Sequence, residues 1–284
     1  MLHVPRVTPG RGFLAGVWQM WAILRAEITM QWRRLGFWLT FGIVGAFLLL
    51  VSVVTAFSLL HPSPMMEQAY KHYTSAEINN VLTYGVTYYA GIVFGLVVAL
   101  LTVDRLRRDT QVGIIELQRA TPLGEIPYTM GKFLGNYLAV SIPILLMYLL
   151  CTMAPIILGM QASIILLFLL AFLLIFAPAS LASMGLVLML ASILPVRVVQ
   201  VGFSVLWLLF NIPAWRALFT IIFNPNGYYI YPLFFPTPLF ASKETSLTKA
   251  LLNITLLVLI GCIAFGLTYV SLTWQRQREE NARA

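Results

Sequence analysis

Long apolar runs alternate with short polar stretches along the whole chain. Runs without a charged residue extend over 35–66, 78–103, 133–196, 217–242 and 250–275. A helix that crosses a bilayer needs about 20 predominantly apolar residues, so each run is long enough for a crossing. The run 133–196 is long enough for two. We expect it to break at 155–161, where proline, glycine and glutamine together favour a turn.

Six transmembrane helices follow from this pattern when the apolar stretch from Val198 past Pro213 is counted as one crossing that kinks or stops at the proline. The predicted spans are 37–60, 82–103, 133–157, 163–193, 197–221 and 250–273. Hydrophobic residues make up 60% of the 284 positions and charged residues 10%, with a mean hydropathy of +0.87. These values exclude a soluble protein. We predict an all-α integral membrane protein in which 1–284 form one transmembrane domain.

Lysine and arginine are unequally divided between the two sides of this topology. Fourteen of the 18 basic residues lie in 1–36, in 104–132, at Arg197 or in the tail, and four lie at Lys71, Arg216, Lys243 and Lys249. Because cytoplasmic flanks carry the excess of positive charge, both termini and the segment 104–132 are expected in the cytoplasm. The net charge of +8 is therefore mainly a topology signal that also suits anionic membrane lipids. No nucleic-acid partner is expected.

The segment Phe13 to Leu35 has the pattern of a helix that lies in the membrane interface. Its apolar residues share one face at helical spacing, and they are Leu14, Val17, Trp18, Trp21, Leu24, Ile28 and Trp32. Gln19, Glu27, Arg33 and Arg34 lie mostly elsewhere. Tryptophan is favoured at the level of the lipid headgroups. The alternative is that 1–36 is only a basic flank that anchors the first span.

Ionisable residues are missing from the middle of every predicted span, whereas ion-coupled carriers usually place such residues there. Arg216, near the outer end of the fifth span, is expected to extend to the headgroups. The chain also lacks a phosphate-binding loop, because Gly131-Lys132 is followed by Phe133 and Gly124 is two residues too far away. We therefore expect no cofactor, no metal site and no ATPase activity in this chain, so a second polypeptide would have to bind any nucleotide.

The cytoplasmic segment 104–132 combines charge with helix-forming residues. Gln111 to Ala120 predicts a short helix with Ile114, Ile115 and Leu117 on one side and Glu116 and Arg119 on the other. Thr121 then caps a second helical turn that begins at Pro122. Two short helices with a charged outer face could transmit force from a partner. The alternative is a solvated loop whose charges only fix the topology.

These residues resemble the type-2 ATP-binding-cassette (ABC) permeases, the membrane subunits of exporters. The resemblance rests on Glu116, on Thr121-Pro122-Leu123, on Gly131-Lys132 before the third span, and on the basic stretch Arg25 to Arg34 at the end of an interfacial helix. It implies that cytoplasmic coupling helices dock on an ATPase subunit. The implied contact residues are Glu116, Arg119, Thr121, Pro122, Leu123, Arg33 and Arg34. It also implies two ATPase subunits that carry ATP and magnesium, and a second permease copy or paralogue.

The outer segment 211–240 is rich in proline and aromatic residues. It is apolar enough to enter the bilayer and too broken for a straight helix, so its backbone must be covered by protein or line a cavity. In the family that the chain resembles, short half-helices re-enter between spans five and six. We expect a re-entrant outer gate here that includes Pro213, Trp215, Phe219 and Phe223. An aromatic belt at the interface is the alternative.

Small residues recur every four positions in two of the predicted spans. Gly91, Gly95 and Ala99 lie on the second span, and Gly131, Gly135 and Ala139 lie where the third begins. Such repeats let helix backbones approach closely. We expect packing within the chain, with a dimer seam or a substrate channel as the alternative.

The main functional hypothesis is an ABC exporter permease in a bacterial or archaeal cytoplasmic membrane. Its passage would lack fixed charges, so the expected cargo is an amphipathic, lipid-linked, peptide or drug-like molecule. One alternative is a membrane scaffold that recruits a cytoplasmic protein without transporting anything. A further alternative is an ATP-independent channel or lipid scramblase.

Overall fold

The computed structural model describes residues 13–70, 72–103, 124–211, 227–237 and 246–283, and the secondary structure of these residues is helical without strands. The elements are α1 (Phe13–Trp32), α2 (Leu35–Leu60), α3 (Pro64–Tyr70), α4 (Ser75–Thr102), α7 (Glu125–Ile157), α8 (Ile164–Ala171), the π-helical turn η1 (Phe172–Phe176), α9 (Ala177–Ile193), α10 (Val196–Asn211), α12 (Tyr231–Phe234) and α13 (Leu247–Arg283).

Five of the six predicted spans are present as helices long and apolar enough to cross a membrane. They are α2, α4, α7, the continuous helix α8–η1–α9, and α13. The chain is therefore a multi-pass membrane protein by the length and composition of its helices. The expected break in the run 133–196 is confirmed, since α7 ends at Ile157 and a turn with Gly159 at φ 100° precedes α8.

Two spans begin earlier than the hydrophobic pattern predicted. The helix α4 begins at Ser75 instead of residue 82, because Thr74 and Glu77 form a capping box in which each side chain bonds the backbone N–H of the other. The helix α7 begins at Glu125 instead of 133. In both cases a polar first turn extends the helix beyond its apolar core, so hydropathy alone underestimates its length.

The predicted span 197–221 is described only in part. The helix α10 is described from Val196 to Asn211. These 16 residues correspond to about 24 Å of helix. This falls short of the roughly 30 Å hydrocarbon core of a bilayer. The sixth crossing therefore stays a prediction, because residues 212–221 lie outside the described residues.

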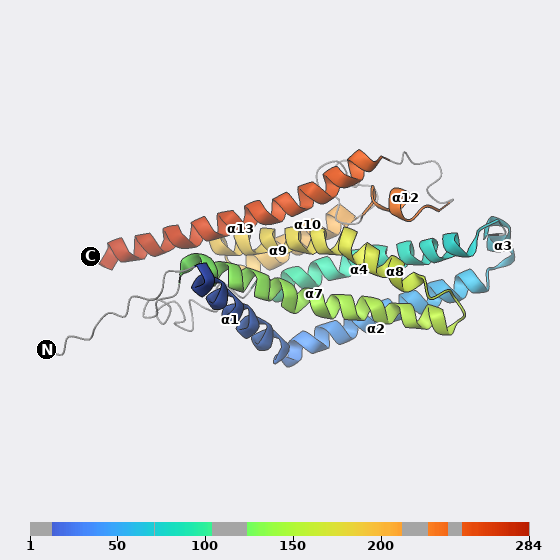
Figure 1. Cartoon of the computed structure of the whole chain (residues 1–284), viewed down its shortest axis with the longest axis horizontal. Helices are drawn as coiled ribbons and strands as arrows, with labels where there is room; N and C mark the ends of the chain where they lie inside the picture. The colour runs from blue at the N-terminus through green and yellow to red at the C-terminus, as the bar shows by residue number, and fades with distance from the viewer. Residues whose placement is uncertain (1–12, 71, 104–123, 212–226, 238–245, 284) are drawn as a thin grey trace.

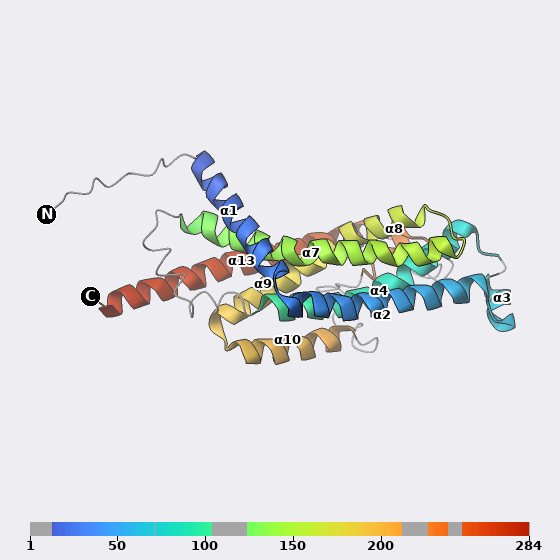
Figure 2. The same ribbon diagram turned by 90° about the horizontal axis from the view of Figure 1, so that it is seen from below.

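The long helices run side by side along the longest axis of the molecule (Figures 1 and 2). The helix α1 crosses obliquely at the end of the bundle where α7 begins and α13 ends, and α3 lies at the opposite end. The helix α4 lies inside the bundle. In its apolar stretch 56% of the residues are buried, against 28% in the corresponding stretches of α2 and α13. The outer faces of these two helices expose large apolar side chains such as Ile43 and Ile263, as expected for contact with lipid.

Two prolines inside α7 are matched by donors from neighbouring helices. A proline in a helix leaves the carbonyl four residues earlier without its usual N–H partner. Pro143 does this to Ala139, whose oxygen accepts the indole N–H of Trp32 at 3.0 Å. Pro155 does it to Cys151, whose oxygen accepts the Ser52 hydroxyl at 2.6 Å. Proline is therefore tolerated here because side chains from α1 and α2 satisfy the exposed carbonyls.

Candidate functional site

Most of the residues proposed from the sequence as functional lie outside the described part of the structure. These are Glu116, Arg119, Thr121, Pro122 and Leu123 of the coupling segment and Pro213, Trp215, Phe219 and Phe223 of the outer segment. Their roles stay predictions. Arg33 and Arg34 are described, and so is the start of α7, which directly follows residues 104–123. We therefore built the candidate site from the α1–α2 corner and from the start of α7.

Arg33 and Arg34 form the corner between α1 and α2. Arg34 is extended, with φ −87° and ψ 120°, and precedes the first turn of α2. The indole N–H of Trp38 donates to the Trp32 carbonyl at 2.6 Å across this corner. The Arg33 side chain is exposed at the same position. The corner is thus a braced bend that presents positive charge at its surface.

The start of α7 packs against α1 at very short range. A Cβ added to Gly131 would lie 2.7 Å from the Met20 carbonyl oxygen, and one added to Gly135 would lie 3.0 Å from the Leu24 carbonyl oxygen. Only glycine permits this backbone approach. The close packing expected for Gly131 and Gly135 is therefore present, and its partner is the helix α1 of the same chain.

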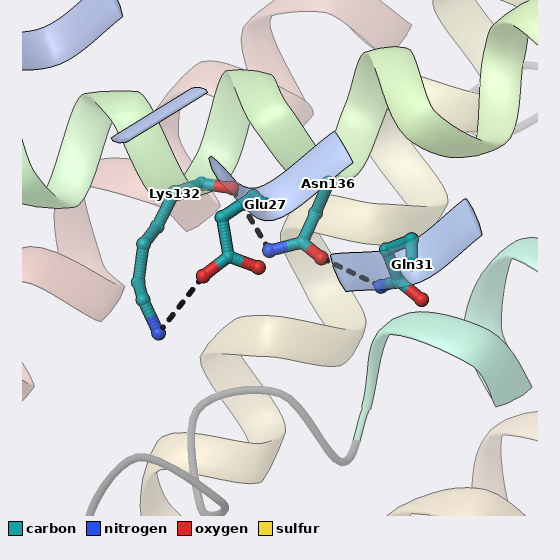
Figure 3. Close-up of polar contacts among 4 residues, drawn as sticks. All are labelled: Glu27, Gln31, Lys132 and Asn136. Atoms are coloured by element: carbon teal, nitrogen blue, oxygen red, sulfur yellow. Dashed lines mark hydrogen bonds and ion pairs between the residues drawn. The ribbon is translucent and has the colours of Figure 1, made fainter. Parts of the chain in front are cut away.

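A buried polar cluster joins the two helices at this contact (Figure 3). The Glu27 carboxylate lies 3.3 Å from Lys132 Nζ. Gln31 Nε2 donates to Asn136 Oδ1 at 2.8 Å, and Asn136 Nδ2 donates to the Lys132 carbonyl at 2.9 Å. The exposed fraction is between 0% and 7% for all four residues. The four residues therefore form two side-chain pairs, linked through the Lys132 carbonyl, that are screened from solvent.

The spacing within the cluster fixes the register of α1 against α7. Glu27 and Gln31 lie one helical turn apart on α1, and Lys132 and Asn136 lie one turn apart on α7. Glu27 therefore pairs with Lys132, and one turn later Gln31 pairs with Asn136. Breaking a buried ion pair on one side costs about 3–5 kcal/mol because a charge is left uncompensated. A slip of α1 by one turn would break both pairs at once. The cluster therefore specifies one position of α1.

The sequence pattern separates Glu27 from the apolar face of α1, and the structure shows which way this side chain is directed. Glu27 is turned toward α7 and is buried, while Leu14, Trp18 and Trp21 of the predicted apolar face are exposed. The helix thus has an apolar face that is exposed and a second face, with both apolar and polar side chains, that packs against α7. Leu24, predicted on the apolar face, belongs to the buried side.

Sequence reasoning missed Gln31 and Asn136 as members of a site and used Lys132 only as part of the Gly131-Lys132 motif at the end of the segment 104–132. A signal for the cluster was nevertheless present. An acid and an amide four residues apart on one helix, matched by a base and an amide four residues apart on another, form a complementary pattern. The pattern becomes visible only when the two helices are known to be neighbours.

A second contact links α1 to the residue that directly follows the coupling segment. The backbone N–H of Gly124 donates to Gln19 Oε1 at 3.4 Å. Nearby, a Cβ at Gly16 would lie 3.5 Å from Pro127 Cγ. The first half of α1 therefore touches the chain just where it leaves the segment 104–123.

The described part of the outer segment packs onto the bundle. Tyr231 and Phe235 are fully buried, the Tyr84 and Tyr231 rings meet edge to face at 4.7 Å, and Asn80 Nδ2 donates to the Pro236 carbonyl at 2.8 Å. Within the described residues 227–237, Tyr231 and Phe235 are therefore covered by the rest of the protein. The gate residues predicted earlier in the segment lie outside the described residues.

Neither a scan against protein-family models nor a search of curated proteins found a match to this chain. Among the described residues, no group of three or more histidine, cysteine, aspartate or glutamate side chains could hold a metal ion. The site geometry therefore carries the functional argument. It consists of a close contact with buried polar pairs between α1 and the start of α7, with Arg33 and Arg34 at the adjacent corner.

Proposed function

We propose that this chain is the membrane-spanning subunit of an ATP-driven exporter of the type-2 ABC class. A separate nucleotide-binding subunit, present in two copies, would hydrolyse ATP with magnesium. A second copy of this chain or a paralogue would complete the membrane part. The cargo would be an amphipathic, lipid-linked, peptide or drug-like molecule that leaves the cytoplasm.

One observation carries this proposal: α1 is locked to α7 where the chain leaves the segment 104–123 and again further along the same helix. The Gly124–Gln19 hydrogen bond lies at that exit, and the buried Glu27–Lys132 pair lies about two turns further along α7. A force applied to 104–123 would act on α7 directly and on α1 through these contacts. Such a joint suits a protein driven by a partner.

Movement of this joint would change the access of the passage. In the proposed cycle, ATP binding draws the ATPase subunits together and pulls the coupling segment with its contact residues Glu116 to Leu123. The α1–α7 unit then moves as a rigid body and carries α2 with it through the Arg33–Arg34 corner. The outer segment with Pro213, Trp215, Phe219 and Phe223 would act as the exit gate.

The proposed setting is a bacterial or archaeal cytoplasmic membrane with both termini in the cytoplasm. The asymmetry of lysine and arginine supports this orientation. The described start of α1 and the end of α13 lie at the same end of the bundle, as this topology requires. The exposed Trp18 and Trp21 of α1 would then lie among the headgroups of the inner leaflet.

The decisive experiment measures coupling to a partner ATPase. The full chain is purified in mild detergent, the copurifying protein with a phosphate-binding loop is identified, and both are reconstituted in lipid nanodiscs. We expect the chain to change the ATPase rate, and Glu116→Ala to abolish that effect without lowering expression. Glu67→Ala, at an exposed site on α3, is the matched control and should leave coupling intact.

The outcomes separate export from the alternatives. An ATPase that binds the chain but hydrolyses ATP at the same rate with and without it would indicate a scaffold. Transport into vesicles that needs no ATP would indicate a channel or scramblase. Unchanged coupling in the Glu116→Ala variant would contradict the role assigned to the coupling segment.

A further inference from the structure

Ser141 differs from the other buried hydroxyl residues of the described spans. Buried serine and threonine residues there usually donate to the backbone carbonyl four residues earlier, as Thr83, Thr102 and Ser183 do. The Ser141 Oγ atom is buried and has no hydrogen-bond partner in the described structure. Its side chain is only 7% exposed. A buried polar atom without a partner is costly in a membrane interior, which points to a use for it.

The Ser141 side chain lines a small cavity in the middle of the bundle. The cavity lies between α4, α7, α9 and α10, and its other walls include Phe94, Gly95, Phe172, Phe176 and Trp207. Its free volume is about 10 Å³, the space of about one water molecule. All residues that line it are uncharged. The cavity is thus an aromatic chamber with a single unused hydroxyl group and almost no free space.

One wall of the chamber is a π-helical turn. Both Phe172 and Phe176 belong to η1, and the N–H of Ala177 bonds back to the Phe172 carbonyl across this turn. π-helical turns are rare and occur frequently at functional sites. Here the turn brings two phenylalanine rings to the same wall, at a centroid distance of 6.2 Å.

Trp207 closes the opposite side of the chamber. Its indole ring covers Gly95 so closely that a Cβ at that position would overlap it, and its N–H donates to the Ile92 carbonyl at 2.9 Å. Trp207 and Phe203 belong to a small cluster that is separate from the large core of the other helices. Among the described residues, Val199, Phe203 and Trp207 are the buried side chains by which α10 joins this cluster. Displacement of α10 would enlarge the chamber by the volume of an indole.

We propose that this chamber is the closed form of a binding site for a small, neutral, aromatic amphiphile. The polar group of the ligand hydrogen-bonds to Ser141 Oγ, and its apolar ring lies between Phe94, Phe172 and Phe176 where Trp207 has withdrawn. An ionised ligand is excluded because the walls offer no opposite charge in a low-dielectric setting. As a cargo site, the chamber rests on the proposed export function.

Photolabelling of the full chain in lipid nanodiscs tests this site without ATP or a partner. The probe is benzyl alcohol with a trifluoromethyl-diazirine group on the ring, and labelled peptides are mapped by mass spectrometry. We expect saturable labelling of the peptides that contain Phe94, Phe172 or Phe176, reduced by excess benzyl alcohol. Trp207→Ala should increase this labelling, because the truncation leaves a cavity of the size that binds benzene, on the order of 150 Å³.

The hydroxyl contact is tested with two serine variants and a second probe. Ser141→Ala should lower the saturable labelling about fivefold, the equivalent of one hydrogen bond of about 1 kcal/mol. Ser58→Ala is the matched control, since Ser58 is exposed on α2 and donates to Val54, and it should have no effect. The phenyl-diazirine probe without the hydroxyl should not distinguish Ser141→Ala from the native chain.

Two results would overturn the site. One is labelling that does not saturate and lies only on the lipid-facing residues of α2 and α13. The other is a Ser141→Ala variant that labels like Ser58→Ala. Because labelling needs no ATPase, saturable labelling in a chain that fails the coupling test would sink the export function and leave the chamber standing. Coupling to the ATPase without saturable labelling would support the export function and contradict the binding site.

Discussion

The indole N–H of Trp32 donates to the carbonyl oxygen of Ala139 at 3.0 Å. That carbonyl lacks its helical partner because Pro143, four residues later, has no N–H. The bond thus ties the last residue of α1 to a defect in α7 that the proline creates. Together with the Glu27–Lys132 pair, it holds the second half of α1 against α7.

The first prediction is that Trp32 and Pro143 are energetically coupled. Trp32→Phe should lower the free energy of unfolding by about 1–3 kcal/mol, the cost of a buried carbonyl without a donor. In a Pro143→Ala background the restored backbone N–H satisfies Ala139, so the same change should cost clearly less. The measurement is thermal unfolding in detergent in a Cys262→Ala background, because Cys262 is exposed. Unfolding is followed by the reaction of a fluorogenic maleimide with the buried thiol of Cys151.

Ser52 and Pro155 provide an independent copy of this arrangement, because Ser52 donates to Cys151. Ser52→Ala and Pro155→Ala should be coupled in the same way, and unfolding of this set is followed by tryptophan fluorescence. The crossed pair, Trp32→Phe with Pro155→Ala, should show additive effects. Additive effects in the two matched pairs would contradict the role given to the prolines.

The second prediction concerns the buried ion pair. Lys132→Met alone should destabilise the chain by about 3–5 kcal/mol, because Glu27 is left as an uncompensated buried charge. The double variant Glu27→Leu with Lys132→Met should recover most of this loss, since neither charge then remains. Arg25→Gln on the exposed side of α1 is the control and should change stability by less than about 0.5 kcal/mol. Failure of the double variant to recover would argue against the pair.

The spans were largely predictable from the sequence because a bilayer imposes a length and a polarity on each of them. Five of the six were found where the apolar runs placed them, and the break before Gly159 followed from local turn chemistry. The starts of α4 and α7 were missed because their first turns are polar. A capping box such as Thr74–Glu77 is visible in the sequence, but hydropathy ignores it.

The α1–α7 joint was only half predictable. The glycine repeat at Gly131 and Gly135 predicts a close helix contact, but a repeat does not identify the helix that packs against it. The sequence pattern separates Glu27 from the apolar face of the helix, but it does not identify a partner for the carboxylate. Its burial depends on Lys132, which is 105 residues away in the chain, and such a pairing is set by tertiary packing.

The third prediction tests how α10 is held. Gly95→Ala should displace the Trp207 ring, because the new Cβ would occupy the same space as the indole. Amide hydrogen exchange of the peptide that covers α10 should then become faster by about tenfold or more. Gly202→Ala lies on α10 with open space around it, so it should leave exchange unchanged. Equal exchange in the two variants would show that Trp207 does not anchor the helix.

The last prediction asks whether α1 and α7 move as one body during the proposed cycle. Gly16 and Pro127 are close enough that a Cβ at residue 16 would lie 3.5 Å from Pro127 Cγ, within reach of a disulfide. In a chain with Cys151 and Cys262 replaced by alanine, Gly16→Cys and Pro127→Cys should cross-link under mild oxidation. The coupled ATPase rate should stay within about twofold of the reduced form, since a bond inside a rigid unit restricts no movement. A loss of coupling that dithiothreitol reverses would show that α1 slides on α7, and the rigid joint would have to be abandoned.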